Sequence, residues 1–413
     1  MSEPYPRRAA VTGIGVIAPN GAGTETFWKA TREGIAVLDK VTREGCQDLP
    51  LKVAGEVRDF DPSAAVEERF LVQTDRFTHF AMAAADLALA DARLGRTLTD
   101  DAPFSVGVVT AAGSGGGEFG QRELQQLWGK GSRFVGPYQS IAWFYAASTG
   151  QISIRRGFKG PCSVVASDEA GGLDALAHAA RAVRRGTDVI VAGSTEAPLA
   201  PYSMVCQLGY DELSTADDPT RAYRPFTSAA CGFVPAEGGA MLVVEDEDTA
   251  RERGARVQAV IAGHAATYTG ASCWKESRHG LAHAMRGALD EAGCAPEEID
   301  VVFADALGVP EADRAEALAI ADVLGSRVPV TAPKTGIGRG YGAAPVLDAA
   351  AAVLAMEHGL IPPTPNVFDI CHDLDLVTGR ARTAELRTAL VLSRGLMGSN
   401  SALVLRHGVT DAS

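Results

Sequence analysis

The chain has 413 residues, of which 46% are hydrophobic and only 6% aromatic, so it can bury one large core or two moderate ones. A formal net charge of −13 argues against a nucleic-acid surface, and no apolar run approaches the ~20 residues of a membrane span. The seven cysteines are scattered, without a C-x-x-C pair or histidines at ligand spacing, and no signal peptide precedes the first strand. These features predict a reduced, cytoplasmic protein without a metal site.

The N-terminal region contains a loose dinucleotide motif. A short strand over residues 9–14 runs into Gly13-Ile14-Gly15-Val16-Ile17-Ala18, which satisfies the pattern G-x-G-x-x-A. A phosphate-binding helix would have to begin directly afterwards, but Pro19-Asn20-Gly21 predicts a turn there and delays the next helix to about Thr24. We therefore expect no nucleotide cofactor, and nothing else in the chain indicates another cofactor.

The next part of the chain alternates between helices and a buried strand. The patterns predict a helix over 77–94, a strand over 104–110, an irregular glycine-rich stretch over 111–117, and helices over 118–128 and 138–154. The last helix carries Trp143-Phe144-Tyr145 at its centre, and three adjacent aromatic residues point around more than one face. Such a helix is expected to be covered on several sides, either by the core or at a subunit interface.

A strand-to-helix elbow follows at residues 164–174. An apolar run ends in Ser167-Asp168-Glu169-Ala170, and a helical pattern begins at once and ends near Arg184. An elbow of this kind places one side chain at a helix N-terminus, where enzymes often position a nucleophile. Here the tip carries Glu169, and neither a cysteine nor a serine stands at it.

The second half of the chain repeats the pattern of the first. Strands at 188–192 and 241–245 close the first series, and the charged segment 246–254 is the best candidate for a boundary. The second series consists of strands and helices in similar order, at 257–261, 280–293, 301–304, 314–324, 345–358, 389–393 and 401–406. This repetition predicts an α/β fold of five layers, αβαβα, from two duplicated halves, 1–250 with interface insertions and 251–413, that share a central helix layer.

Four sets of residues indicate a known family. They are Val11-Thr12-Gly13-Ile14-Gly15-Val16, Arg224-Pro225-Phe226 with Ala236-Glu237-Gly238-Gly239, Pro333-Lys334-Thr335, and Asp375-Leu376-Val377-Thr378-Gly379-Arg380. With these segments the whole chain resembles the ketosynthase-like proteins of the thiolase fold. Within them it is most similar to the chain-length factors, or ketosynthase β-subunits, of bacterial type II polyketide synthases.

The resemblance also implies which positions would carry catalysis. Active ketosynthases have a cysteine at the elbow and two histidines in later segments, whereas the matching positions here hold Glu169, Asp305 and Arg339; Lys334 is retained. Condensation needs a thiolate to carry the acyl chain and imidazoles to stabilise an enolate oxygen. We therefore expect no condensing activity. A glycine-rich turn of the family has also become Gly395-Leu396-Met397-Gly398.

Chain-length factors usually carry glutamine at the elbow, so Glu169 leaves three hypotheses open. Its carboxylate could be held by the N–H groups of the elbow and the helix dipole, it could meet a cation such as Arg339, or it could keep a role in decarboxylation. A different class of function is also open, that of a thiolase-fold acyltransferase or malonyl decarboxylase acting through Glu169 or Ser167.

The resemblance implies two partners, a catalytic ketosynthase α-subunit that forms a heterodimer with this chain and an acyl carrier protein that delivers the polyketide. The β-subunit would close the far end of a tunnel at their interface, with gating positions at Gly117, Gly120, Leu124 and Ile141. The two glycines predict an open end that suits a long or stiff chain, a polyene or an extended poly-β-ketone. A flexible loop before a helix is the less favoured interpretation of these glycines, and a scaffold without influence on the product is a further alternative.

Overall fold

The computed structural model describes residues 7–95, 102–270 and 274–408. Its longer strands are β1 (Ala9–Ala18), β5 (Val106–Ala111), β6 (Cys162–Val165), β7 (Val189–Glu196), β8 (Gly238–Asp246), β9 (Ala259–Tyr268), β10 (Val301–Phe303), β11 (Pro329–Thr331), β15 (Thr388–Arg394) and β16 (Ser399–His407). The two-residue strands are β2 (Gly21–Ala22), β3 (Asp39–Lys40), β4 (Val53–Ala54), β12 (Leu360–Ile361), β13 (Asp375–Leu376) and β14 (Arg382–Thr383). The helices are α1 (Thr24–Arg32), α2 (Pro62–Ala65), α3 (Glu68–Leu71), α4 (Arg76–Asp91), α6 (Gly117–Lys130), α7 (Gln139–Ala142), α8 (Ala147–Arg156), α9 (Gly171–Arg184), α10 (Pro201–Gln207), α11 (Glu247–Glu252), α12 (Trp274–Ala292), α13 (Pro310–Leu324) and α14 (Ala343–His358).

The main sheet has the same strand order on both sides of its centre. The order is β13-β11-β10-β15-β16-β9-β1-β8-β7-β5-β6, and β1 and β9 meet only over residues 9–11 and 259–261. Outward from this junction, each side has two antiparallel pairs, β1–β8–β7 and β9–β16–β15. Two parallel pairs follow on each side, β7–β5–β6 and β15–β10–β11, and β13 adds a third parallel pair beyond β11. The topology therefore contains the internal repetition that the sequence predicts.

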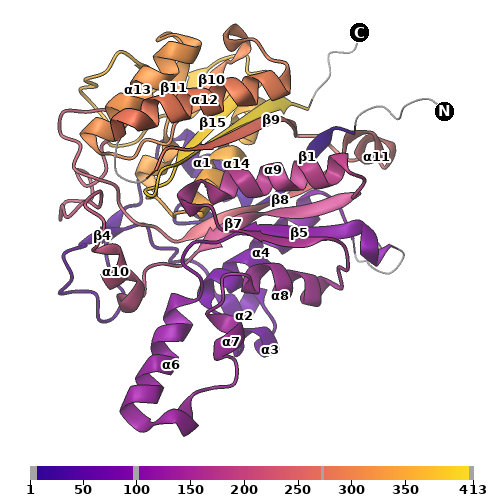
Figure 1. Cartoon of the computed structure of the whole chain (residues 1–413), viewed down its shortest axis with the longest axis vertical. Coiled ribbons are helices and arrows are strands. Elements are labelled where there is room, and N and C mark those ends of the chain that lie inside the picture. Colours follow the sequence, from indigo (N-terminus) through magenta and orange to yellow (C-terminus); the bar gives the residue numbers. More distant parts are fainter. Residues whose placement is uncertain (1–6, 96–101, 271–273, 409–413) are drawn as a thin grey trace.

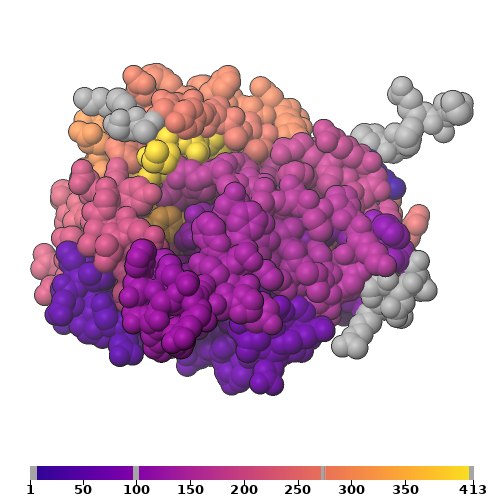
Figure 2. Space-filling view, turned by 60° about the horizontal axis from the view of Figure 1, so that its bottom comes forward, coloured from indigo at the N-terminus to yellow at the C-terminus, as the bar shows by residue number. Residues whose placement is uncertain are grey.

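Five layers result from the way helices cover the two parts of the sheet (Figure 1). Helices α4 and α8 cover the outer face of the β1–β8–β7–β5–β6 part, and α12, with α13 beside it, covers the outer face of the other part. Helices α9 and α14 lie between the two parts and contact strands of both. This arrangement confirms the predicted αβαβα fold. Helix α6 extends away from these layers at the bottom of Figure 1, and Figure 2 looks onto that face of the molecule.

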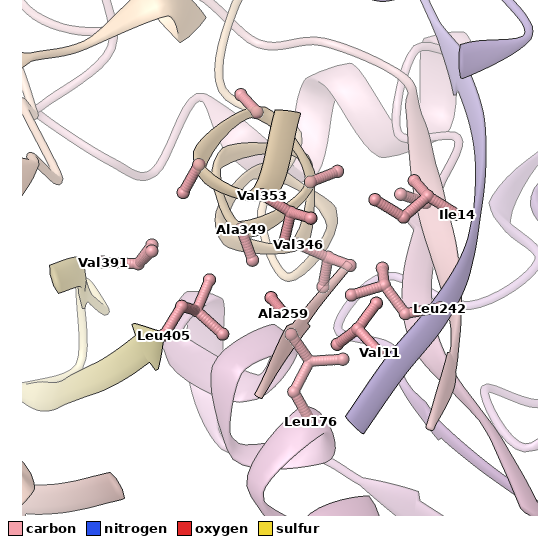
Figure 3. Packing of buried hydrophobic residues seen from close by; sticks show 14 of the residues in the cluster. Val11, Ile14, Leu176, Leu242, Ala259, Val346, Ala349, Val353, Val391 and Leu405 are labelled. Carbon is pink, nitrogen blue, oxygen red and sulfur yellow. The ribbon is translucent and has the colours of Figure 1, made fainter. Parts of the chain in front are cut away.

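The central helix layer explains why the chain is rich in alanine and valine. All residues of α14 from 343 to 356 are buried, because the helix is enclosed on every side. In Figure 3, Val346, Ala349 and Val353 of this helix lie between Leu405 of one part of the sheet and Leu242 of the other. Small and β-branched side chains allow two sheets and a helix layer to pack closely, which larger aromatic side chains would prevent.

The G-x-G motif near the N-terminus is a packing feature inside strand β1. A Cβ added to Gly13 would lie 2.2 Å from the carbonyl oxygen of Ala88 in α4. Gly263 occupies the equivalent place in β9, where a Cβ would lie 2.2 Å from the carbonyl oxygen of Ala288 in α12. Both glycines let a helix approach the sheet, so the motif forms no phosphate-binding loop. The turn after it and the start of α1 at Thr24 agree with the prediction.

The prediction of a single helix over residues 138–154 is wrong. Helix α7 ends at Ala142 and α8 begins at Ala147, because the Trp143 carbonyl accepts a hydrogen bond from the N–H of Gly116 (3.0 Å) in the neighbouring loop. Trp143, Phe144 and Tyr145 lie at this break and are 51%, 42% and 40% exposed, respectively. The core of this chain therefore does not cover these three side chains, which leaves the hypothesis that they lie at a subunit interface. No helix in the described part of the chain is long and apolar enough to span a membrane.

The repeated glycine contact gives a stability test. We expect Gly13→Ala and Gly263→Ala each to lower the free energy of unfolding by about 1–3 kcal/mol, since the new methyl group forces helix and strand apart. Chemical denaturation with urea measures this loss. Gly129→Ala in α6 is the control, because a Cβ there meets nothing within 4 Å. Unchanged unfolding midpoints for both strand variants would contradict the packing role.

Candidate functional site

The elbow lies where the sequence predicts it. Strand β6 ends at Val165, a short 3₁₀ helix spans Asp168–Ala170, and α9 begins at Gly171. Asp168 adopts the left-handed conformation, with φ of 56°, which turns the chain sharply out of the sheet. Glu169 is thereby placed at the start of α9 and is only 3% exposed. Cys162 begins β6 and is too far along the strand to reach this tip.

The carboxylates of the elbow bind the turn between β15 and β16. The Leu396 N–H donates to Glu169 Oε2 (2.8 Å), and the Met397 N–H donates to Asp168 Oδ2 (2.7 Å). Burial, and next the hydrogen bond and charge of Asp168, raise the pKa of Glu169 well above its usual range, while Arg339 opposes this shift. Glu169 is thus a buried acid whose neutral form is favoured.

Two of the hypotheses for Glu169 need correction. A backbone N–H does hold its carboxyl group, but the donor comes from the β15–β16 turn and not from the elbow itself. Arg339 is not its ion-pair partner, because the guanidinium binds Asp305 instead, with Nη1 2.7 Å from Oδ1. The hypothesis of a residual role in decarboxylation is not tested by these contacts.

Asp305 and Arg339 belong to a fully buried ion cluster that includes Arg394. Nε and the backbone N–H of Arg394 donate to the Asp305 carboxylate at 3.2 and 3.0 Å, and Nη2 donates to Glu316 (2.9 Å). Burial alone would raise the pKa of Asp305, but Arg339, Arg394 and Lys334 lower it to about 2. Asp305 is therefore ionised, and both of its oxygens are occupied.

The retained lysine, Lys334, contacts both this cluster and helix α14. Lys334 Nζ lies 2.5 Å from Asp348 Oδ2 of α14 and donates to the backbone carbonyl of Asp305 (3.1 Å). Burial raises the pKa of Asp348 to about 6, although Lys334 opposes the shift. The lysine thus links the central helix to the segment that carries Asp305.

The sequence analysis did not single out Arg394 or Glu316. Arg394 ends the apolar run of β15, and a cation directly after such a run is a signal that could have identified it. Glu316 lies in the alanine-rich helix α13 and is also fully buried, which its local sequence does not indicate.

A pocket of about 550 Å³ opens beside the elbow. Its lining includes Asp168 and Glu169, Gly117 at the start of α6, and four tyrosines, Tyr145, Tyr202, Tyr210 and Tyr341. Figure 2 shows the surface hollowed on this face, beside the protruding purple segment. The structure therefore brings one expected gating position, Gly117, to the same pocket as Glu169.

The other expected gating positions do not line this pocket. Gly120 lies one turn further along α6, and a Cβ on it would be 3.8 Å from Cβ of Trp143. Leu124 is 39% exposed on α6, and Ile141 lies on α7. Because Gly117 and Gly120 are both helical residues, the interpretation of a flexible loop before a helix is wrong.

Ser167 is directed away from the pocket. Its hydroxyl donates to Asp174 of α9, whose carboxylate also contacts His264 Nε2 (3.0 Å) and Ser401 Oγ (2.8 Å). No imidazole contacts Ser167 in these bonds, so this serine lacks the base that activates a nucleophilic hydroxyl. Across residues 7–95, 102–270 and 274–408, no three histidine, cysteine or acidic side chains gather as metal ligands would.

Comparisons with known proteins agree with this architecture. Residues 7–250 match the model of the beta-ketoacyl synthase N-terminal domain, and residues 258–368 match that of the C-terminal domain. The chain belongs to the beta-ketoacyl synthase family. It is 76% identical to "Putative polyketide beta-ketoacyl synthase 2" of Streptomyces coelicolor, over 97% of this chain and 95% of the relative.

Two further comparisons, one of sequence and one of structure, show similarity to subunits of polyketide synthases. It is 50% identical to the tetracenomycin polyketide synthase ketoacyl synthase beta subunit of Streptomyces glaucescens, over 99% of this chain and all of the relative. Among solved structures it is similar to the ishigamide ketosynthase/chain length factor, with a TM-score of 0.88 and 29% identity, over 98% of this chain and 100% of the other. These findings confirm the resemblance that the sequence motifs indicate.

The buried cluster makes a clear prediction for stability. Asp305→Asn leaves Arg339 and Arg394 without their counter-charge, so we expect the free energy of unfolding to fall by about 3–5 kcal/mol. Denaturant unfolding of the purified variant measures this. Asp322→Asn is the matched control, because its pair with Arg278 is about one-third exposed on both sides and its loss costs under about 1 kcal/mol. Similar losses for both variants would contradict the structural role of the cluster.

Proposed function

We propose that the chain is the non-condensing chain-length factor of a type II polyketide synthase. It pairs with a catalytic ketosynthase α-subunit, shapes the polyketide tunnel and limits the length of the chain. The observation that carries this proposal is the buried cluster around Asp305, Arg339 and Arg394, which takes the place of the catalytic imidazoles, beside an elbow that holds Glu169. Without a thiolate or an imidazole at these places, the decarboxylative condensation has to occur on the partner.

The surface around α6 to α8 supports a partner subunit. Trp143, Phe144 and Tyr145 are all at least 40% exposed, and Trp128 near the end of α6 is 83% exposed. Among the described residues, β6 is the last strand on its side of the sheet and pairs with β5 alone, so its outer edge is available to another chain. Exposed aromatic residues beside an open sheet edge are typical of an obligate interface.

The same surface leads to the pocket, because Tyr145 belongs to both. A partner seated on the aromatic residues would therefore cover the mouth of the pocket and convert it into the end of a tunnel. Gly117 lies in the wall of this tunnel, and Gly120, Leu124 and Ile141 are proposed to line it further toward the partner. An acyl carrier protein would deliver the chain to the partner's active site, and a cytoplasmic location remains part of the proposal.

The chemistry of the pocket wall favours an unreduced chain. Tyr145, Tyr202 and Tyr210 present hydroxyl groups, and Gln207 presents an amide that accepts a hydrogen bond from Tyr341. Hydroxyl groups donate to carbonyl oxygens, which a poly-β-ketone carries on every second carbon and a polyene lacks. We propose an extended poly-β-ketone as the growing chain. For the protein itself, we propose that residues 1–250 and residues 251–413 are its two structural units.

Substitution of Gly117 tests the control of chain length. We expect Gly117→Phe, co-expressed with the α-subunit, to shift most of the product to shorter chains, because the ring fills the pocket. A Cβ at this position already lies 2.1 Å from Ser203 Oγ, so this hydroxyl has to rotate away. Product analysis by mass spectrometry is the readout, and co-purification at equal amounts verifies the complex. Gly129→Phe, on the same helix but without neighbours, controls for a bulky residue on α6. Full-length product from an intact Gly117→Phe complex would refute the gating role.

Acyl labelling tests the alternative of an acyltransferase or decarboxylase. After incubation with a malonyl thioester, we expect the intact mass of the chain to be unchanged, because Ser167 bonds to Asp174 and Glu169 is a buried acid. An adduct that disappears in Glu169→Gln or Ser167→Ala would instead establish an acyl-carrying role for that residue.

A further inference from the structure

Two consecutive carboxylates hold two consecutive N–H groups where the elbow meets the β15–β16 turn. Glu169 accepts from Leu396 and Asp168 from Met397, at 2.8 and 2.7 Å. The fit is tight, because a Cβ on Gly395 would lie 1.9 Å from Asp168 Oδ2. The left-handed conformation of Asp168 directs its carboxylate into this turn. The contact joins the elbow to a turn more than 220 residues later in the chain.

Nothing in the described part of the chain neutralises both carboxylates. Neither lies within ion-pair distance of a described cation, and Arg339, whose charge lowers the pKa of Glu169, is bound to Asp305. Two adjacent negative charges repel, and Glu169 is buried whereas Asp168 is partly exposed, so Glu169 is the group that is driven to keep its proton. The hydrogen bond between the two side chains and the burial of Glu169 both raise the pKa of Glu169.

The other titratable groups around this pair do not relieve the repulsion between the two carboxylates. Those that line the pocket with it are Cys206 in α10, Tyr210 after this helix and Tyr341 before α14, and Glu196 at the end of β7 acts on Tyr341. None of them supplies a positive charge, because thiol, phenol and carboxyl groups are either neutral or negatively charged. Burial raises the pKa of Tyr210, of Tyr341 and of Glu196, which favours their neutral forms.

We propose that Asp168 and Glu169 hold one proton between them, and that the neutral Glu169 is a positioning residue for the Gly395–Gly398 turn, which packs against the elbow. One oxygen of Glu169 carries the proton and donates it to the Asp168 carboxylate, while Oε2 accepts from the Leu396 N–H. A neutral carboxyl group then offers the same pattern as a side-chain amide, with one donor and one acceptor. The argument uses contacts within this chain alone and does not depend on the proposed function.

The sign of the pH dependence follows from the raised pKa. The acid pair is complete at low pH, and its contribution declines as pH rises above the ordinary value of 4.5 and through the folded-state pKa of Glu169. Ionised Glu169 repels Asp168, and the hold on Leu396 and Met397 weakens. Glutamine at position 169 keeps the donor and the acceptor but has no proton to lose.

Hydrogen exchange of the turn tests this proposal. In the full-length protein, with its partner subunit where the two co-purify, we expect the protection of the peptide containing Leu396 and Met397 to fall about tenfold or more between pH 5 and 9, after correction for the intrinsic rate. In Glu169→Gln the protection should change by less than about twofold, and Tm should exceed that of the wild type by a margin that widens with pH.

Glu196→Gln is the matched control, because it removes another buried acid, one that holds Gly113 and Ser114 of the pocket wall, and should leave the wild-type profile intact. Protection that is constant with pH in the wild type, or that falls equally in Glu169→Gln, overturns the proposal. Asp168→Asn provides a second variant should Glu169→Gln fail to fold. It removes the repelling charge and should shrink the decline, and a full wild-type decline in this variant overturns the shared proton.

Discussion

The buried carboxylate of Asp305, enclosed by two arginines, is the constraint on which the rest of the site depends. Arg394 is the last residue of β15, and both its side chain and its backbone N–H bind Asp305. Arg339 in turn donates to the carbonyl oxygen of Arg394. The cluster therefore fixes the end of the strand from which the β15–β16 turn begins, and this turn holds the carboxylates of the elbow. A buried ion cluster is costly to desolvate, and it is tolerated here because each charged group has several partners.

The elbow has kept the geometry of a catalytic site while its chemistry has changed. Glu169 occupies the tip at the start of α9, where a nucleophile would be presented to the pocket, but it is a buried acid bound to a backbone N–H. Asp305 and Glu316 are occupied by the two arginines, so neither carboxylate is a free base for chemistry at the elbow. What the fold still offers is a pocket beside the elbow, next to an exposed aromatic surface. Function in such a case depends on the site and its partner and not on the fold itself.

Much of the architecture could be predicted because it rests on local patterns. The order of strands and helices, the elbow and the repetition of the two halves all follow from periodicity and turn residues, which act over short distances. The predicted helix over 138–154 failed for the opposite reason. The helix is broken where the N–H of Gly116 donates a hydrogen bond to the carbonyl oxygen of Trp143, which is then not used within a helix. No local sequence signal indicates this contact. Likewise, the resemblance gave Gly117 and Gly120 as gating positions and a flexible loop was the alternative, whereas the structure places both within α6 and only Gly117 at the pocket.

The sequence alone determined which chemical groups are present at the elbow and at the two later positions, and so excluded thiolate and imidazole chemistry there. It also determined the order of the elements, since hydrophobic periodicity is a property of neighbouring residues. Only the tertiary structure decided which charges meet. Arg339 binds Asp305 and not Glu169, and Glu169 binds a turn of the other half of the chain, because these pairings depend on distances between segments far apart in the sequence. In a dry interior, where an unpaired charge is most costly, those distances decide whether a carboxyl group is an ion or a neutral acid.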